Sequence, residues 1–238
     1  MVWAIMLGPL VLFSLFLVLL AYGWLGFMPT FEELENPKSN QASEIISSDQ
    51  KVLGKYYIEN RSSVTFSNLS PNVVNALVAT EDARFFKHSG VDFRALVRVI
   101  ARPLLGGTGG GGSTITQQLA KNLFPREKMN KVEFALRKFK EWVIAIKLER
   151  NYTKDEIIAM YLNTVDFGHN SFGIKSAAKT YFNSTPDSLN IQQAAMLVGM
   201  LKAPTYYSPI KNPVNALRRR NTVLSQMKKY NYLTETQF

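Results

Sequence analysis

The stretch SPNVVNALVATED, residues 70–82, carries the signals of a helix start followed by a helix body. Ser70 is of a type that caps helix N-termini, and Pro71 suits the first helical position, where an N–H would have no intrahelical partner. Apolar residues then follow up to the acidic pair Glu81-Asp82. The pattern predicts a helix that ends in two adjacent carboxylates.

Helix signals of the same kind continue toward the C-terminus. Apolar residues keep helical spacing through residues 126–150, and Thr153 with Glu156 has the spacing of a capping box. Asn212-Pro213 repeats the cap-plus-proline start. No repeat of fixed period is present, so a solenoid is not expected. The fold class that these signals predict is mainly α.

The N-terminal segment has the composition of a membrane span. Residues 1–31 contain no charged side chain. As a helix at ~1.5 Å per residue, the apolar residues 2–27 would exceed a hydrocarbon core of ~30 Å. A cleaved signal peptide is the rival interpretation, but its apolar stretch of ~7–15 residues would end in a small-residue cleavage site. We therefore expect one transmembrane anchor over residues 1–27.

The rest of the chain divides into a linker and one domain. Residues 28–50 are polar and interrupted by Pro29 and Pro37, which is typical of a linker. The domain then comprises residues 51–238, a length suited to a single hydrophobic core. Its first segment, residues 51–59, is rich in β-type residues and predicts a short strand or hairpin.

Charge and composition narrow the class of partner. The 238 residues carry a formal net charge of +10. Such a basic excess favours nucleic acid, acidic lipid or a phosphorylated substrate, and a membrane tether favours the latter two. The absence of cysteine excludes disulfides and zinc–cysteine sites. The two histidines, His88 and His169, form no HExxH spacing, so we expect His88 to form structural hydrogen bonds rather than to bind a metal.

Two segments in the middle of the chain suit an anionic ligand. The run GGTGGGG, residues 106–112, precedes Ser113, which we expect to cap the next helix. Without Gly-Lys-Ser the run is no P-loop, and it fits an anion-binding loop or a flexible linker. Arg137 and Glu141 share one helix face, where they form either a surface ion pair or part of a diphosphate site.

Four segments, taken in order, resemble a single enzyme family. They are EDARFFKHSGVD (residues 81–92), GGSTITQQLAKNLF (111–124), RKFKE (137–141) and KDEIIAMYLN (154–163). The family is that of the family 51 glycosyltransferases, the peptidoglycan polymerases. The chain resembles in particular the membrane-anchored transglycosylase domain of class A penicillin-binding proteins, over roughly residues 52–230.

The resemblance implies a lysozyme-like, mainly α glycosyltransferase domain preceded by one N-terminal transmembrane helix. The implied activity is polymerisation of lipid II into glycan strands, with inversion at the anomeric carbon and release of undecaprenyl diphosphate. The implied partners are lipid II, the growing glycan strand, the lipid bilayer and other cell-wall synthesis proteins, and not nucleic acid. The implied location is the inner (plasma) membrane, with a single pass and the catalytic domain on the outer, periplasmic side.

The resemblance also carries site roles onto matching positions. Glu81 would be the general base, and Glu141 would act beside the diphosphate. The substrate-binding positions that it implies are Asp82, Phe86, His88, Ser113, Thr114, Gln117, Gln118, Lys121, Asn122 and Arg137. The resemblance requires no cofactor and assigns no metal ligand, but it leaves room for a divalent cation, magnesium or manganese, at the diphosphate.

Alternatives of other classes stay open at this point. A lysozyme-like enzyme that cleaves glycans would also use a catalytic glutamate. A non-catalytic, basic, membrane-anchored module would bind acidic lipid or nucleic acid and need no carboxylate. No SxxK, SxN or KTG pattern of a transpeptidase is present. The chain is therefore either a monofunctional enzyme or, as we expect, a fragment of a bifunctional one.

Overall fold

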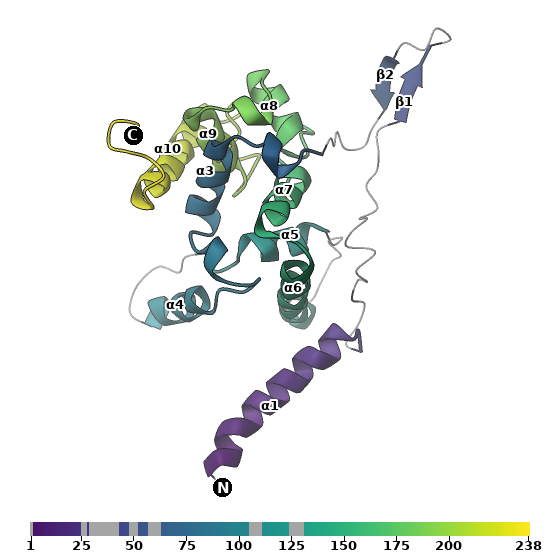
Figure 1. The fold of residues 1–238 in the computed structure, drawn as a ribbon, viewed down its shortest axis with the longest axis vertical. Coiled ribbons are helices and arrows are strands. Elements are labelled where there is room, and N and C mark those ends of the chain that lie inside the picture. Colours follow the sequence, from purple (N-terminus) through teal and green to yellow (C-terminus); the bar gives the residue numbers. More distant parts are fainter. Residues whose placement is uncertain are drawn as a thin grey trace.

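The computed structural model describes residues 2–24, 28, 43–47, 52–56, 63–104, 111–123 and 131–238. Within these ranges the regular elements are helices and one two-stranded hairpin, which confirms the predicted mainly α class. The α-helices are α1 (Val2–Ala21), α3 (Pro71–Glu81), α4 (Phe93–Leu104), α5 (Ile115–Leu123), α6 (Lys131–Asn151), α7 (Lys154–Thr164), α8 (Ile174–Phe182), α9 (Ile191–Met200) and α10 (Pro213–Lys229) (Figure 1). Single 3₁₀ turns are η1 (Phe66–Asn68), η2 (Phe85–Lys87) and η3 (Pro186–Ser188), and the strands are β1 (Ser43–Ile46) and β2 (Val52–Tyr56).

Of the strand or hairpin predicted for residues 51–59, the structure describes a single strand, β2, and its partner β1 lies inside the predicted linker. β1 and β2 are antiparallel, with Ser43 opposite Tyr56 and an irregularity between Ile45 and Ile46. A lone strand leaves its backbone N–H and C=O groups unpaired, so β2 needs a second strand. The residue pattern of β2 does not indicate which segment provides that strand. Figure 1 shows the hairpin apart from the helical body.

Helix starts follow the caps that the sequence predicts. The Ser70 hydroxyl accepts from the Asn72 N–H and donates to the Leu189 carbonyl oxygen at 2.8 Å, so one side chain caps α3 and ties it to a distant segment. Thr153 and Glu156 form the predicted capping box of α7. Replacing such a cap by alanine typically costs ~1 kcal/mol.

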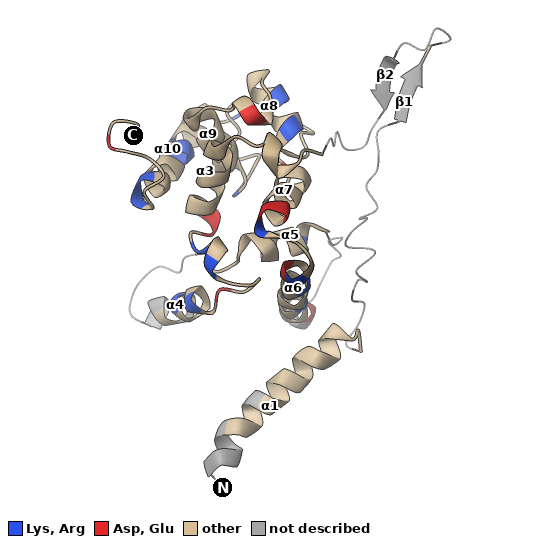
Figure 2. Ribbon diagram, viewed as in Figure 1, with Lys and Arg blue, Asp and Glu red and all other residues tan. Residues whose placement is uncertain are grey.

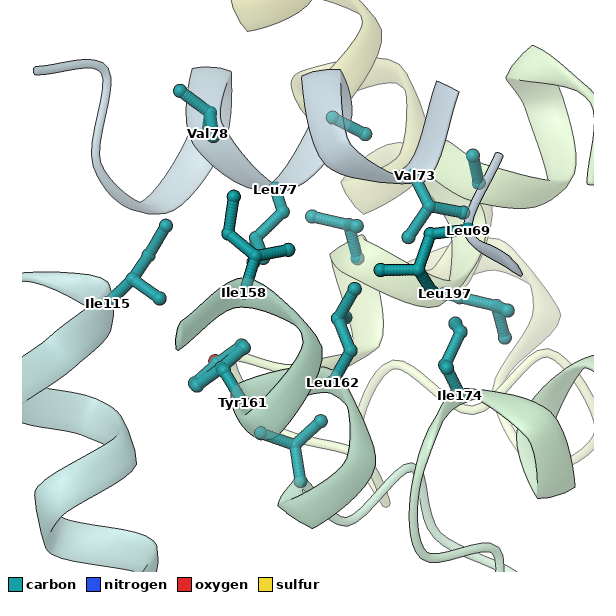
Figure 3. Packing of buried hydrophobic residues seen from close by; sticks show 14 of the residues in the cluster. Leu69, Val73, Leu77, Val78, Ile115, Ile158, Tyr161, Leu162, Ile174 and Leu197 are labelled. Atoms are coloured by element: carbon teal, nitrogen blue, oxygen red, sulfur yellow. The ribbon is translucent and has the colours of Figure 1, made fainter. Parts of the chain in front are cut away.

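A single core fixes α3 against α7, α8 and α9. Its fully buried side chains come from all of these helices and from the start of α5 (Figure 3). Leu77 of α3, Ile158 of α7 and Leu197 of α9 each have no exposed surface. Burial of one such side chain contributes about 1.5–3 kcal/mol, so the axis of α3 is strongly fixed. The acidic end of α3 is thereby held beside the start of α5.

Helix α1 lies outside this core and touches α6. The rings of Phe13 and Phe16 contact the Phe139 ring, with centroids 5.9 and 5.4 Å apart respectively. Lys147 of α6 donates to the Ala21 carbonyl oxygen at 3.3 Å. Among the residues that the structure describes, no helix meets the length and apolarity needed to span a bilayer. The predicted transmembrane helix is therefore not confirmed by the structure.

Candidate active site

Glu81 is the last residue of α3, and its carboxylate is partly open. Its side chain is 18% exposed. The Gln118 amide Nε2 donates to Glu81 Oε2 at 3.0 Å, and Arg219 Nη2 of α10 lies 3.7 Å from Glu81 Oε1. In Figure 2 the acidic end of α3 is the end nearer to α4 and α5. One oxygen of the carboxylate is thus held by Gln118, and the other lies at ion-pair distance from Arg219.

Asp82, the neighbouring carboxylate, is buried and fully engaged. Its oxygens lie 3.0 and 3.2 Å from Nε2 of His88, and Oδ2 accepts from the Ile115 N–H at 3.2 Å. Asp82 therefore joins the end of α3, the following turn and the first residue of α5. The structural role expected for His88 is confirmed by this contact. Lys154 also donates to the His88 carbonyl oxygen at 2.7 Å.

The start of α5 corrects one predicted cap. Thr114, and not Ser113, precedes the first helical residue, and the Thr114 hydroxyl accepts from the Gln117 N–H at 3.1 Å. The same hydroxyl donates to the Gly90 carbonyl oxygen at 2.6 Å. Thr114 rather than Ser113 is the N-cap because its hydroxyl bonds both a backbone N–H of α5 and a carbonyl oxygen of the adjacent turn. Ser113 instead accepts from Lys138 at 2.9 Å. Of the glycine run 106–112, residues 106–110 lie outside the described residues.

A second carboxylate, Glu141, lies among cations of α6. Its side chain is 8% exposed, with Oε1 3.7 Å from Arg137 Nε and Oε2 2.8 Å from Lys138 Nζ. The predicted pairing of Arg137 with Glu141 on one helix face is confirmed. Lys138 adds a bridge from Glu141 to Ser113, so α6 is tied to the segment before α5.

One cleft of 690 Å³ collects most of the predicted site. Its lining includes the predicted residues Glu81, Ser113, Gln117, Gln118, Lys121, Arg137 and Glu141, and also Phe134, Lys138, Leu201 and Lys202, which the sequence analysis did not assign. Asp82, Phe86, His88, Thr114 and Asn122 are not among the residues that line it. The two carboxylates of the cleft face four Lys or Arg side chains, so the lining favours an anionic ligand.

A second cavity, of 270 Å³, adjoins the same end of α3. Glu81 lines both cavities, and Asp82 and Thr114 line only this smaller one. Arg84 and Arg98 also line it, and Arg84 Nε lies 3.1 Å from the Asp92 carboxylate. Glu81 is therefore the one acidic side chain in the described lining of both spaces.

Two residues near Glu81 escaped the sequence analysis. Arg219 lies in the basic run 218–220, which by itself looks like a solvated face. Tyr161 of α7 donates its hydroxyl hydrogen to Gln118 Oε1 at 3.0 Å. Burial raises the pKa of Tyr161 well above its usual range, and the charge of Glu81 raises it further. The position of Tyr161 inside the fourth motif was the signal in the sequence that could have indicated a role at the site.

The donor set does not fit a protein-held divalent cation. Magnesium and manganese take several oxygen ligands in near-octahedral geometry. In the cleft the carboxylate nearest the cationic lining is Glu141, and its oxygens face Arg137 and Lys138. Among the described residues no cluster of three or more His, Asp or Glu side chains could hold a metal.

Comparison with known proteins agrees with the motifs. The transglycosylase family profile matches residues 49–228. Penicillin-binding protein 1F of Bacillus subtilis (strain 168) is 41% identical over 194 residues, which cover 81% of this chain and 27% of that protein. Penicillin-binding protein 1A of Escherichia coli (strain K12) is 37% identical over 212 residues, covering 89% of this chain and 24% of that protein. Penicillin-binding protein 1A of Aquifex aeolicus (strain VF5) is 37% identical over 235 residues, covering 96% of this chain and 31% of that protein.

The chain thus spans less than a third of the length of each of these relatives. The matched family profile nevertheless covers most of the chain, including the four motif segments and both carboxylates of the cleft. This chain belongs to the transglycosylase family.

Proposed function

We propose that this chain polymerises lipid II into glycan strands. The observation that carries the proposal is the placement of Glu81, a partly open carboxylate that lines both a cation-rich cleft and a second cavity. Glycosyl transfer needs two sugars to meet at one base, and two spaces that share Glu81 suit that need. The larger cleft would take the donor with its diphosphate, and the smaller cavity the acceptor sugar.

In this reaction Glu81 acts as general base. It takes the proton of the acceptor 4-hydroxyl while that oxygen attacks the anomeric carbon of the donor. The bond from the anomeric carbon to the diphosphate oxygen breaks on the opposite face, and the electron pair leaves with undecaprenyl diphosphate. The configuration inverts, and Glu81 ends the step protonated.

The cations of the main cleft stabilise the departing charge. Lys121 and Arg137 line the cleft and pair with phosphate oxygens, while Lys138 stays bridged between Ser113 and Glu141. Such preorganised charges act strongly where water is excluded. Glu141 orients Arg137 and Lys138. In this way a carboxylate contributes to diphosphate binding indirectly, because it holds cationic side chains in position.

We further propose that the N-terminal segment, residues 1–27, anchors the chain in the inner membrane, with the catalytic domain on the outer side. The sequence of residues 1–31, which has no charged side chain, supports this anchor. A lipid-linked substrate does not leave the bilayer, so an anchored enzyme meets it in two dimensions. Other cell-wall synthesis proteins would join it there.

The deciding experiment replaces Glu81. General-base catalysis typically contributes ~100–10,000-fold, so Glu81→Gln should lower the rate of lipid II polymerisation by at least about 100-fold. The variant should remain folded and still bind a phosphoglycolipid inhibitor of the moenomycin type. Glu235→Gln, at an exposed pair with Lys228, is the matched control and should polymerise normally.

Purified peptidoglycan, offered to the same preparations, separates transfer from cleavage. Release of glycan fragments without polymerisation would favour the lysozyme-like alternative. Near-normal polymerisation by Glu81→Gln would place the base elsewhere, and Asp82 would be tested next.

A further inference from the structure

The orientation of the Gln118 amide follows from its two neighbours. An ionised carboxylate only accepts hydrogen bonds, so the amide nitrogen must face Glu81, as it does at 3.0 Å. The amide oxygen then faces Tyr161, whose hydroxyl donates to it at 3.0 Å. The three groups form a chain with a single direction of donation, from Tyr161 through Gln118 to Glu81.

Tyr161 is well suited to be the fixed end of this chain. It is 1% exposed and packs in the core beside Ile158 of the same helix (Figure 3). Burial and the nearby charge of Glu81 both raise the pKa of Tyr161, so its hydroxyl keeps the hydrogen that it donates. The phenol is anchored in α7, whereas Gln118 is partly exposed at the cleft.

Loss of the tyrosine hydroxyl would free the amide to turn over. Gln118 Oε1 would lose its donor, and the reversed amide would set its oxygen against the Glu81 carboxylate, which is repulsive. In the observed arrangement Oε2 of Glu81 is held, and Oε1 is left for the acceptor proton. Arg219 Nη2, at 3.7 Å from Oε1, lies beyond hydrogen-bond distance.

We propose that Tyr161 is a positioning residue that acts through Gln118 to orient Glu81 for proton abstraction. This inference rests on the proposed function, because it presumes that Glu81 is the base. It adds a core residue from the fourth motif, which lines neither cavity, to the groups that determine the rate. Tyr161 itself touches neither sugar nor diphosphate.

The first test is Tyr161→Phe in the full chain, assayed on lipid II. Removal of one orienting hydrogen bond should lower kcat roughly three- to tenfold. KM and affinity for the moenomycin-type inhibitor should change less than about twofold, because neither depends on the orientation of the base. Tyr181→Phe is the matched control, since it removes a 2.8 Å bond from a tyrosine hydroxyl to the Phe167 carbonyl oxygen outside the cleft. Unchanged kcat in folded Tyr161→Phe overturns the proposal.

A double-mutant cycle distinguishes positioning from general support of the fold. If Tyr161 acts through Gln118, Tyr161→Phe should have no further effect on kcat in a Gln118→Ala background. Independent, multiplicative losses would mean that Tyr161 acts by another route, and they overturn the proposal. If Glu81→Gln polymerises normally, the assignment of the base fails first, whatever the tyrosine variants do.

A second variant serves if Tyr161→Phe does not fold. In Gln118→Glu the new carboxylate can still accept from Tyr161, but its other oxygen must face Glu81 without a donor. Its kcat should therefore fall below that of Gln118→Ala. A kcat equal to or above that of Gln118→Ala overturns the proposed direction of the hydrogen-bond chain.

Discussion

The cationic side chains of the main cleft differ in how far they are already committed. Lys138 Nζ is held by Ser113 at 2.9 Å and by Glu141 at 2.8 Å. Lys121 lies in the last turn of α5, is exposed and lines the same cleft. A cation that already has two close partners gains less from an incoming phosphate than an exposed one. At the scale of single residues, Lys121 should therefore respond most directly to a diphosphate.

Lys121→Ala should weaken binding of the moenomycin-type inhibitor by about tenfold or more, the effect of losing one hydrogen bond between charged groups. Calorimetric or fluorescence titration of the folded variant measures it. Lys175→Ala, at an exposed position of α8, provides the control for the loss of one positive charge. Unchanged inhibitor affinity together with unchanged polymerisation would remove Lys121 from the site.

At the scale of elements, the turn between α3 and α4 acts as a brace for α5. Asp82 accepts from the first residue of α5, and the Gly90 carbonyl oxygen accepts from Thr114. Gly90 has φ of +86° and approaches α6 so closely that a Cβ would lie 2.8 Å from the Ala145 carbonyl carbon. The backbones of three elements therefore meet at a position that only glycine suits.

Gly90→Ala should lower the free energy of unfolding by about 1–3 kcal/mol, because it adds a strained φ to a clash with the α6 backbone. Thermal and denaturant unfolding measure the change. Gly111→Ala is the control, since a Cβ there would meet nothing within 4 Å. Equal midpoints for the two variants would show that the turn can move away from α6 at little cost.

At the scale of the whole molecule, α1 packs against α6 through aromatic rings. Phe13 and Phe16 of α1 pack on Phe139, two residues from Arg137 and Glu141 on the same helix. The segment proposed as the membrane anchor thus touches α6, the helix that carries Arg137, one of the two cations proposed to bind the diphosphate. This placement suits a site that works beside the lipid tail of its substrate.

Deletion of residues 1–27 should reduce turnover of long-chain lipid II in membranes more than turnover of a short-chain analogue in detergent. The anchor concentrates the enzyme where the long-chain substrate is confined, and it gives no such advantage with a dispersed analogue. Initial rates with both substrates, compared between the full and shortened chains, provide the measurement. Equal losses with both substrates would argue against a role in substrate access.

The sequence by itself determined the features that depend on residues close to one another along the chain, namely helix caps and ion pairs within one helix. The caps at Ser70 and Thr153 and the pair Arg137–Glu141 all join residues within four positions, and each was predicted. The family could also be identified from the sequence, because its four motifs are short segments that occur in a fixed order along the chain. One local prediction was wrong by a residue, since Thr114 outcompetes Ser113 as a cap by also bonding Gly90.

Only the tertiary structure decided how the site is assembled around Glu81. Gln118 lies 37 residues from Glu81 in sequence, and Tyr161 lies 43 residues from Gln118. Arg219 approaches from the last helix, where its basic neighbours suggest nothing more than a solvated face. Periodicity and capping describe which face of a helix is apolar and where that helix starts. They do not describe which helices the core brings together, because that depends on burial summed over the whole domain.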